Sequence, residues 1–408
     1  MSWRFGVLKS KLLYAVLFAT AIVSGGYLVV SAVQELLSEA TIFVPQRVLK
    51  DTRPFAGNAD ESSVAWAQAQ YKNLEKAVAD VWGSQETVLP SPTRYVKYSQ
   101  DYQARALVDF ERGDLKVETV NSIYPVRSLK EAIVSTILAQ EGDGAVQFSD
   151  ADARPANQKD PALYGQILDD KGRPMRYGDR AVNYANELIK NSLQKRDIWA
   201  NGSRKTVYSI KTRLQDDSLS QRTAKYKDII TNAARKYGLS DRLLLAITKT
   251  ESYFNPFAVS RASAYGLMQI VPSSAGAEVY ELLNGRKGRP QREHLFDAAN
   301  NIEYGAAYLH ILAKRYFGGI DNPSSLKLCT IAAYNGGPSA VLKTFGPTRE
   351  QAIQKINSMD HNEVYRHLIK NLPSYETKRY VDKVVAAMSL FTADSQFTAA
   401  YQPRAGSL

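Results

Sequence analysis

From Tyr226 to its end, the chain reads as a series of short helices separated by glycines, which predicts an all-α domain. Glycine fits the left-handed position that follows a helix, and Pro338 fits a first helical turn. The separating glycines are Gly238, Gly285, Gly318-Gly319, Gly336-Gly337 and Gly346. The predicted helices span 224–237, 241–252, 273–284, 297–317, 324–335, 338–345, 348–358, 361–371 and 375–391.

The half before this domain has a mixed pattern, so the fold class predicted for the whole chain is α+β. Apolar side chains recur at steps of three and four over 60–83, which predicts an amphipathic helix. Ser128 and Glu131 predict a capping box for the helix that follows the strands. The other predicted elements of this small α+β unit are strands at 94–98, 104–110, 115–119 and 206–210 and a helix at 180–193, with a hairpin turn at Arg112-Gly113-Asp114.

Residues 12–33 carry no charge and follow a segment, 1–11, with three basic residues and no acid. At 1.5 Å per residue a helix of this length spans roughly 33 Å, enough to cross a bilayer. The basic flank predicts a cytoplasmic N-terminus and places the rest of the chain outside the inner membrane. A cleaved signal peptide, processed at Val30-Ser31-Ala32, is the alternative.

Glu251 stands near the end of the helix predicted at 241–252, which Ser240 is expected to cap. Leu244, Ile247 and Glu251 share one helix face that is otherwise apolar. Desolvation and the negative end of the helix dipole both disfavour the carboxylate, so Glu251 is a candidate general acid that stays protonated near neutral pH. The alternative is a glutamate at the solvent edge of its helix.

Four motifs follow one another in the helical half. Glu251-Ser252 is followed by Ser260, nine residues after the glutamate, and then by Gly266-Leu267-Met268-Gln269. The other motifs are Ala333-Tyr334-Asn335-Gly336-Gly337 and Pro373-Ser374-Tyr375-Glu376-Thr377-Lys378-Arg379-Tyr380-Val381. In this order they resemble the core of soluble lytic transglycosylases, lysozyme-like enzymes that cut peptidoglycan glycan strands. The resemblance implies a goose-type lysozyme-like fold for this half.

The resemblance also implies a reaction without hydrolysis at the bond between N-acetylmuramic acid and N-acetylglucosamine. Glu251 would protonate the glycosidic oxygen and then take the proton from the muramyl C6 hydroxyl, leaving a 1,6-anhydro ring. The substrate's own N-acetyl group would help to stabilise the developing positive charge. Glycosidases ordinarily use two carboxylates, but the motifs supply only Glu251, and Asp297 and Glu303 lie on predicted helices that the sequence cannot place.

Further site residues follow from the same motifs. The implied roles are a saccharide hydrogen bond from Ser260, apolar surface under a sugar ring from Met268, sugar positioning by Gln269, packing against sugar by Tyr334, a site hydrogen bond from Asn335, and a hydrogen bond from Tyr380 that holds Glu251. The alternatives are a plain turn residue for Ser260, a core gap-filler for Met268, and helix-core aromatics for both tyrosines.

The N-terminal unit resembles the accessory domain of the membrane-bound lytic murein transglycosylase C family, through Arg94-Tyr95-Val96-Lys97-Tyr98, Asp101-Tyr102-Gln103 and the hairpin. That family's usual lipidated cysteine is missing, because the only cysteine is Cys329. We therefore expect an inner-membrane anchor with the catalytic domain in the periplasm, rather than outer-membrane attachment. The predicted boundaries are 1–11 cytoplasmic N-terminus, 12–33 transmembrane signal-anchor, 34–59 linker, 60–215 accessory domain, 220–395 catalytic domain and 396–408 tail.

The formal net charge of +11 suits a polyanionic partner, but no zinc-finger spacing, RNA-binding aromatic motif or long basic block supports nucleic acid. The four histidines form no metal-ligand pattern, and there is no phosphate loop or dinucleotide fingerprint, so no metal or cofactor is expected. The basic loop Arg286–Arg292 either lines a cleft for an acidic glycopeptide or is solvated. Peptidoglycan glycan strands are the expected partner, and cell-wall synthesis or division proteins stay open.

Three functions compete on these observations. A lytic transglycosylase in cell-wall turnover and remodelling is favoured. A muramidase of the same fold with a water nucleophile would give products heavier by one water. An inactive, anchored wall-binding protein is the third, and the intact motifs around Glu251 disfavour it.

Overall fold

The computed structural model describes residues 62–141 and 160–391, and all of them belong to one compact unit, residues 59–408. The predicted N-terminus, anchor, linker and tail, residues 1–11, 12–33, 34–59 and 396–408, lie outside the described residues. Over the described ranges, no helix is both long and apolar enough to span a membrane. The anchor therefore stays a prediction from the sequence.

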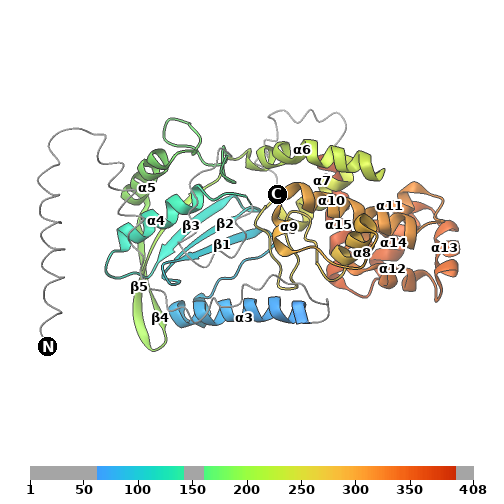
Figure 1. Ribbon diagram of the computed structural model, residues 1–408, viewed down its shortest axis with the longest axis horizontal. Helices are drawn as coiled ribbons and strands as arrows, with labels where there is room; N and C mark the ends of the chain where they lie inside the picture. The colour runs from blue at the N-terminus through green and yellow to red at the C-terminus, as the bar shows by residue number, and fades with distance from the viewer. Residues whose placement is uncertain (1–61, 142–159, 392–408) are drawn as a thin grey trace, which may run out of the picture. The chain divides into compact units, whose positions relative to one another are not determined.

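Five strands form one antiparallel sheet in the order β1-β2-β3-β5-β4 (Figure 1). The strands are β1 (Arg94–Ser99), β2 (Ala104–Asp109), β3 (Asp114–Thr119), β4 (Gln194–Ala200) and β5 (Ser203–Arg213). The predicted hairpin is confirmed, because β2 and β3 pair from Ala104↔Thr119 to Asp109↔Asp114.

Strand β4 is absent from the sequence prediction. Its sequence, QKRDIWA, is mostly polar and exposed, because β4 lies at the edge of the sheet and only Ile198 and Ala200 are buried. The signal for it is the turn Asn201-Gly202, where both residues have positive φ, 51° and 74°. An Asn-Gly pair between two strands is the strongest short-range hairpin signal.

Helices cover both faces of the sheet. α3 (Ser62–Trp82) packs on one face, where Leu74, Val78 and Trp82 meet Val96 and Ile198. α4 (Pro125–Ile137) and α5 (Gly178–Ser192) lie on the other face and join the main core. A short 3-10 turn, η1 (Ser84–Glu86), links α3 to the sheet.

The predicted capping box at Ser128 and Glu131 is wrong. α4 begins at Pro125, three residues before Ser128, because proline is well suited to the first helical turn. Ser128 is buried inside the helix, and its Oγ lies 2.7 Å from Oγ1 of Thr119. Glu131 instead accepts a hydrogen bond from Arg127 at 2.8 Å.

From Ser218 to Leu390 the regular elements are all helical, as predicted. α7 and α12 match their predicted bounds, α6 begins six residues earlier than expected, and α9 was not predicted. The expected helix 297–317 is divided, since α10 passes into a π-helical turn, η3. The elements are α6 (Ser218–Tyr237), α7 (Asp241–Ser252), α8 (Ala275–Asn284), α9 (Arg292–Phe296), α10 (Ala298–Ile311), η3 (Leu312–Tyr316), α11 (Pro323–Gly336), α12 (Pro338–Phe345), α13 (Arg349–Asn357), α14 (His361–Asn371) and α15 (Tyr375–Leu390).

The sheet and the helices share one continuous core. The rings of Tyr95 on β1 and Phe257 stack with their centroids 4.2 Å apart. Buried Arg222 on α6 donates hydrogen bonds to the carbonyl oxygens of Phe110 and Tyr253, at 3.0 and 3.1 Å. Because Tyr253 directly follows the helix that carries Glu251, Arg222 ties the segment that leaves the candidate site to the accessory half.

Candidate active site

Glu251 lies on the last turn of α7, at the position that the sequence predicted. Leu244 and Ile247 on the same face are fully buried, whereas Glu251 itself is only partly buried. The helix ends at Ser252, and Tyr253 takes the left-handed conformation, φ 52°. Ser240 stands at the N-cap position as expected, but its side chain makes no capping hydrogen bond in the described structure.

The carboxyl group of Glu251 is held by Tyr380 on α15, whose hydroxyl donates to Oε1 at 2.7 Å. Desolvation raises the pKa of Glu251 to about 7, the hydrogen bond from Tyr380 opposes that rise, and the nearby charge of Glu376 adds to it. A carboxyl group with this pKa is substantially protonated at neutral pH and can both give and take a proton.

Glu376 is a second carboxylate near the site that the sequence reasoning did not use. It lies one position after Tyr375 in the last motif, it is exposed to solvent, and it acts on Glu251 through charge. The two acids that the sequence left unplaced are engaged elsewhere. Asp297 caps α10 by accepting from the backbone N–H of Asn300, and Glu303 is bound to Lys236 and Tyr237.

The loop after α7 turns at Asn255, whose Oδ1 accepts from the backbone N–H of Phe257 at 3.0 Å. Gly266 takes a positive φ of 74°, and a Cβ there would overlap the side chain of Asn301 and the carbonyl oxygen of Leu295. Glycine is therefore required both for conformation and for space. Ser252 holds the same loop by donating from its hydroxyl to the carbonyl of Leu267 at 2.7 Å.

Asn301 on α10 is the residue that fixes this loop, and the sequence reasoning missed it. Its buried side-chain amide donates to the carbonyl oxygens of Tyr265 and Leu295, both at 2.8 Å, and accepts from the N–H of Met268 at 2.7 Å. The available signal is an asparagine within an otherwise largely apolar helix, since a buried amide must find partners.

Met268 and Gln269 occupy different environments. The Met268 side chain is fully buried against Gly305, which favours a core role over a surface beneath a sugar ring. Gln269 has a left-handed backbone, φ 51°, and its Nε2 donates to the carbonyl of Gly266 at 2.9 Å. Its Oε1 is buried and has no hydrogen-bond partner among the described residues, so this acceptor can serve a ligand.

Tyr334 and Asn335 at the end of α11 approach the same region. The Tyr334 hydroxyl donates to the carbonyl of Met268 at 2.8 Å. Desolvation raises the pKa of Tyr334, and the nearby charge of Glu251 raises it further. Oδ1 of Asn335 accepts from Thr377 at 2.8 Å. Thr377 was not predicted as a site residue, and its place in the last motif is the signal for it.

Ser260 forms a turn in the structure. Its Oγ accepts from the backbone N–H groups of Ala262 and Ala264, at 3.2 and 3.0 Å. This arrangement agrees with the turn alternative, and a saccharide contact from the remaining hydroxyl hydrogen stays a prediction.

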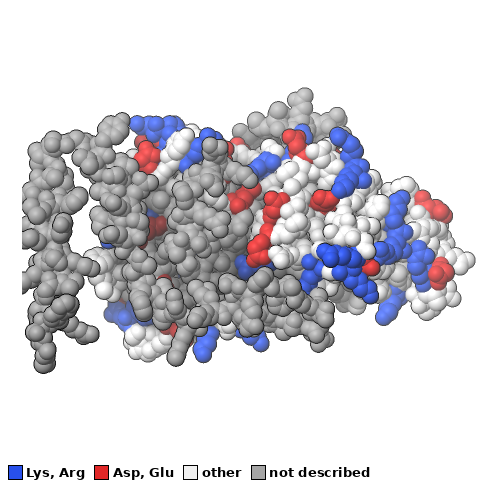
Figure 2. Space-filling model, in the orientation of Figure 1, with Lys and Arg blue, Asp and Glu red and all other residues white. Residues whose placement is uncertain are grey.

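The basic loop 286–292 follows α8, and Figure 2 shows Lys and Arg side chains gathered over the position that α8 has in Figure 1. Arg286 and Lys287 are exposed. The guanidinium of Arg292 lies over the rings of Tyr265 and Phe296, 5.8 and 5.3 Å from their centroids. The loop is thus solvated at its start and anchored beside the Gly266 segment at its end. Across residues 62–141 and 160–391, no group of three or more His, Cys, Asp or Glu is placed to hold a metal ion.

Comparison with known proteins places both halves. Residues 228–357, a range that includes Glu251 but ends before Tyr380, match the transglycosylase SLT domain. Residues 50–225 match the N-terminal domain of membrane-bound lytic murein transglycosylase C. In its domain make-up the chain is therefore similar to membrane-bound lytic murein transglycosylase C, with an N-terminal domain of that type followed by a transglycosylase SLT domain.

Two solved structures also resemble part of the chain. One is an inactive mutant of the lytic transglycosylase Slt from Pseudomonas aeruginosa, at 27% identity, and the other is the 70 kDa soluble lytic transglycosylase from Escherichia coli, at 24% identity. Each match covers 40% of this chain with a TM-score of 0.31, and the chain spans only 23% of the length of either protein. The similarity to the family rests on the two domain matches.

Proposed function

We propose that the protein cleaves the β-1,4 bond between N-acetylmuramic acid and N-acetylglucosamine without water and releases 1,6-anhydromuropeptides. The observation that carries this proposal is a single partly buried carboxyl group, Glu251, with a pKa of about 7 and a tyrosine hydroxyl on one oxygen. The first step of the reaction needs a group that gives a proton, and the second step needs a group that takes one.

In the proposed reaction, protonated Glu251 donates its proton to the glycosidic oxygen, and the bond from that oxygen to C1 of the muramyl residue breaks. The hydrogen bond from Tyr380 occupies Oε1, so we assign the transferred proton to Oε2. Tyr380 then stabilises the resulting carboxylate, because a hydrogen bond to a charged acceptor is stronger than one to a neutral acceptor.

The ring closes when the muramyl C6 hydroxyl attacks C1 and Glu251 takes its proton, which returns the enzyme to its starting state. The positive charge that develops at C1 is assigned to stabilisation by the substrate's N-acetyl group. The negative charge of Glu376 also favours a positive charge nearby, and it adds to the larger effect of desolvation that raises the pKa of Glu251.

The other predicted residues position the sugar in this proposal. Gln269 offers its unpartnered Oε1, Tyr334 and Asn335 line the approach from α11, and Ser260 keeps one hydroxyl hydrogen for a saccharide. Met268 contributes through its backbone, because its side chain is buried. We further propose that residues 60–215 and 220–395 are the accessory and catalytic domains, and that the enzyme acts in the periplasm from an inner-membrane anchor.

Mass spectrometry of the products from purified peptidoglycan tests the proposal. Anhydro ends are lighter than hydrolysed ends by one water. The expected result is anhydromuropeptides from the wild type, and release that is slower by about 10² or more from Glu251→Gln. Hydrolysed ends would instead assign the protein as a muramidase with Glu376 as the candidate second carboxylate. The absence of any cleavage by a folded wild-type protein would assign a wall-binding role.

A further inference from the structure

One end of the accessory sheet exposes large apolar side chains. Ile123 and Tyr124, in the loop before α4, are 74% and 65% exposed, Val126 is 50% exposed, and Trp199 on β4 is 74% exposed. Single exposed apolar residues are common, but aromatic and aliphatic residues gathered at one end of a domain indicate an interaction surface.

Strand register places these residues at the same end. The loop that carries Ile123 and Tyr124 leaves the sheet from Thr119, which pairs with Tyr208 on β5. The β4–β5 hairpin continues past that pair, so Trp199, opposite Arg204, stands beyond the end of β3. In Figure 1 the hairpin extends past the rest of the sheet, and the loop before α4 lies at the same end.

The opposite end of the sheet faces the catalytic half. There the N–H of Leu214 binds the carbonyl of Gly113, and Arg222 on α6 binds the carbonyl of Phe110. The apolar end is therefore remote from Glu251, and the exposed residues have no role in the reaction proposed above.

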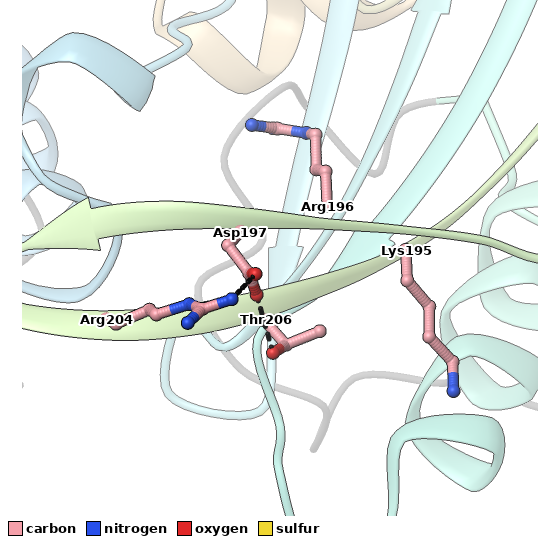
Figure 3. A pocket seen from close by; sticks show the side chains of 5 residues that line it. All are labelled: Lys195, Arg196, Asp197, Arg204 and Thr206. Atoms are coloured by element: carbon pink, nitrogen blue, oxygen red, sulfur yellow. Dashed lines mark hydrogen bonds and ion pairs between the residues drawn. The ribbon is translucent and has the colours of Figure 1, made fainter.

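This end also carries a basic cavity of about 410 Å³, lined by Lys195, Arg196, Asp197, Arg204 and Thr206 (Figure 3). Arg204 and Thr206 bind the carboxylate of Asp197, which neutralises it. Arg196 points the other way in Figure 3 and binds Glu86. The Lys195 ammonium lies 5.2 Å from the Tyr208 ring centroid and has no ion pair among those of the described residues. The cavity therefore presents uncompensated positive charge.

We propose that this end of the sheet is a peripheral docking surface for an anionic phospholipid bilayer. Trp199, Tyr124 and Ile123 enter the headgroup region, and Lys195 binds lipid phosphate beside them. Tryptophan and tyrosine favour the membrane–water interface, and basic side chains are attracted to anionic lipid. The cluster is a few side chains on a projecting hairpin and a loop, too small for a stable protein interface, which buries about 800 Å² on each partner.

A predicted membrane-spanning segment in the same chain would hold this surface near a membrane. The uncharged run 12–33 precedes the accessory half in the same chain, and a second, weaker attachment would fix the orientation of a tethered domain. The catalytic half, at the other end of the sheet, would then point away from the bilayer.

The test uses full-length protein with vesicles whose lipids carry brominated acyl chains, which quench nearby tryptophan. The chain has four tryptophans, Trp3, Trp66, Trp82 and Trp199. The difference in quenching between the wild type and Trp199→Phe therefore reports on Trp199 alone. We expect this difference in vesicles containing phosphatidylglycerol and a much smaller one in pure phosphatidylcholine.

Charge reversal at Lys195 is the second arm. Lys195→Glu should lower the quenching of Trp199, because each cation near an anionic membrane changes partitioning by about fivefold. Lys211→Glu is the matched control, since Lys211 is an exposed lysine at the other end of β5 and should leave the quenching unchanged. Equal quenching of wild type and Trp199→Phe in all lipids would overturn the proposal, as would quenching that is independent of lipid charge. Self-association that requires Trp199, without quenching, would assign the surface to a second copy and also overturn it.

Discussion

The hydroxyl of Tyr380 donates to Oε1 of Glu251 at 2.7 Å, although the two residues are 129 positions apart in the chain. α7 and α15, which carry them, pack directly against each other in the helical half. The proposed acid is therefore complete only when the first and last parts of the catalytic half have folded together.

Tyr380→Phe removes that hydrogen bond and little else. The bond lowers the pKa of Glu251, so the variant should carry a higher Glu251 pKa, and its activity should persist to higher pH. The maximal rate should fall roughly ten- to a hundredfold, since a hydrogen bond to a charged group contributes about 1.5–3 kcal/mol. The pH profile of anhydromuropeptide release measures both effects. Tyr365→Phe, which loses only an exposed bond to Asp382, is the control and should match the wild type.

Glu251→Gln should lower the rate by about 10² to 10⁴ or more, because one residue serves as acid and as base. In the wild type, kcat/KM should be constant below pH 7 and fall above it, since only protonated Glu251 starts the reaction and its pKa is about 7. Initial rates between pH 5 and pH 9 test this. A profile that rises through pH 7, or a glutamine variant with near-normal turnover, would remove Glu251 from the role of acid.

The same residue should make stability depend on pH. The pKa of Glu251 rises from an ordinary 4.5 to about 7 on folding, so the native state binds this proton more tightly than the unfolded state. Its contribution to stability is full below about pH 4.5 and is lost as pH rises to about 7. The stability of Glu251→Gln minus that of the wild type should therefore increase between pH 5 and pH 8, by roughly 1–3 kcal/mol. Thermal melts of both proteins at the two pH values give the comparison.

The sequence predicted the elements that depend on local pattern. Glycine punctuation and apolar spacing placed α7 and α12 at their observed bounds. Two local predictions failed because a stronger local signal competed. Pro125 starts α4 ahead of the Ser128 capping pattern, and Asn201-Gly202 makes a hairpin of a charged segment that lacks β-strand alternation.

The residues that sequence reasoning missed in the site are those whose role depends on packing between distant segments. Asn301 and Thr377 bind the site residues Met268 and Asn335 across the fold, and no spacing rule connects them. Burial likewise could not be read from the motif for Met268, whose side chain points into the core rather than toward a ligand.

The predicted membrane anchor, residues 12–33, lies outside the described residues, so cell fractionation is its test. If the uncharged run 12–33 is an uncleaved span, fractionation should recover full-length protein in the inner membrane, resistant to salt extraction. The control is a variant with Leu17→Arg and Val23→Arg, which should lose the membrane fraction because a charge at the bilayer centre is costly. N-terminal sequencing that finds a mature protein beginning near Val33 would show a cleaved signal peptide instead.

Asn301→Ala should damage both stability and binding, through the loop that it holds. The substitution leaves the carbonyl oxygens of Tyr265 and Leu295 and the N–H of Met268 without their partner in a buried site. Each unsatisfied buried group costs roughly 1–3 kcal/mol, so the melting temperature should fall clearly. Gln269 lies next to Met268 on this loop, so KM should rise. The pH at which activity falls should stay near 7, because Glu251 keeps its Tyr380 partner.

The measurement is KM, kcat and the pH profile of Asn301→Ala at a temperature well below its own melt. Asn300→Ala is the matched control, since the side chain of Asn300 contacts only His294 at the surface among the described hydrogen bonds. A shift in the pH profile would mean that the substitution disturbs Glu251 directly. Unchanged KM and melting temperature would show that the Gly266–Gln269 loop holds its shape without the buried amide, and Asn301 would then have no positioning role.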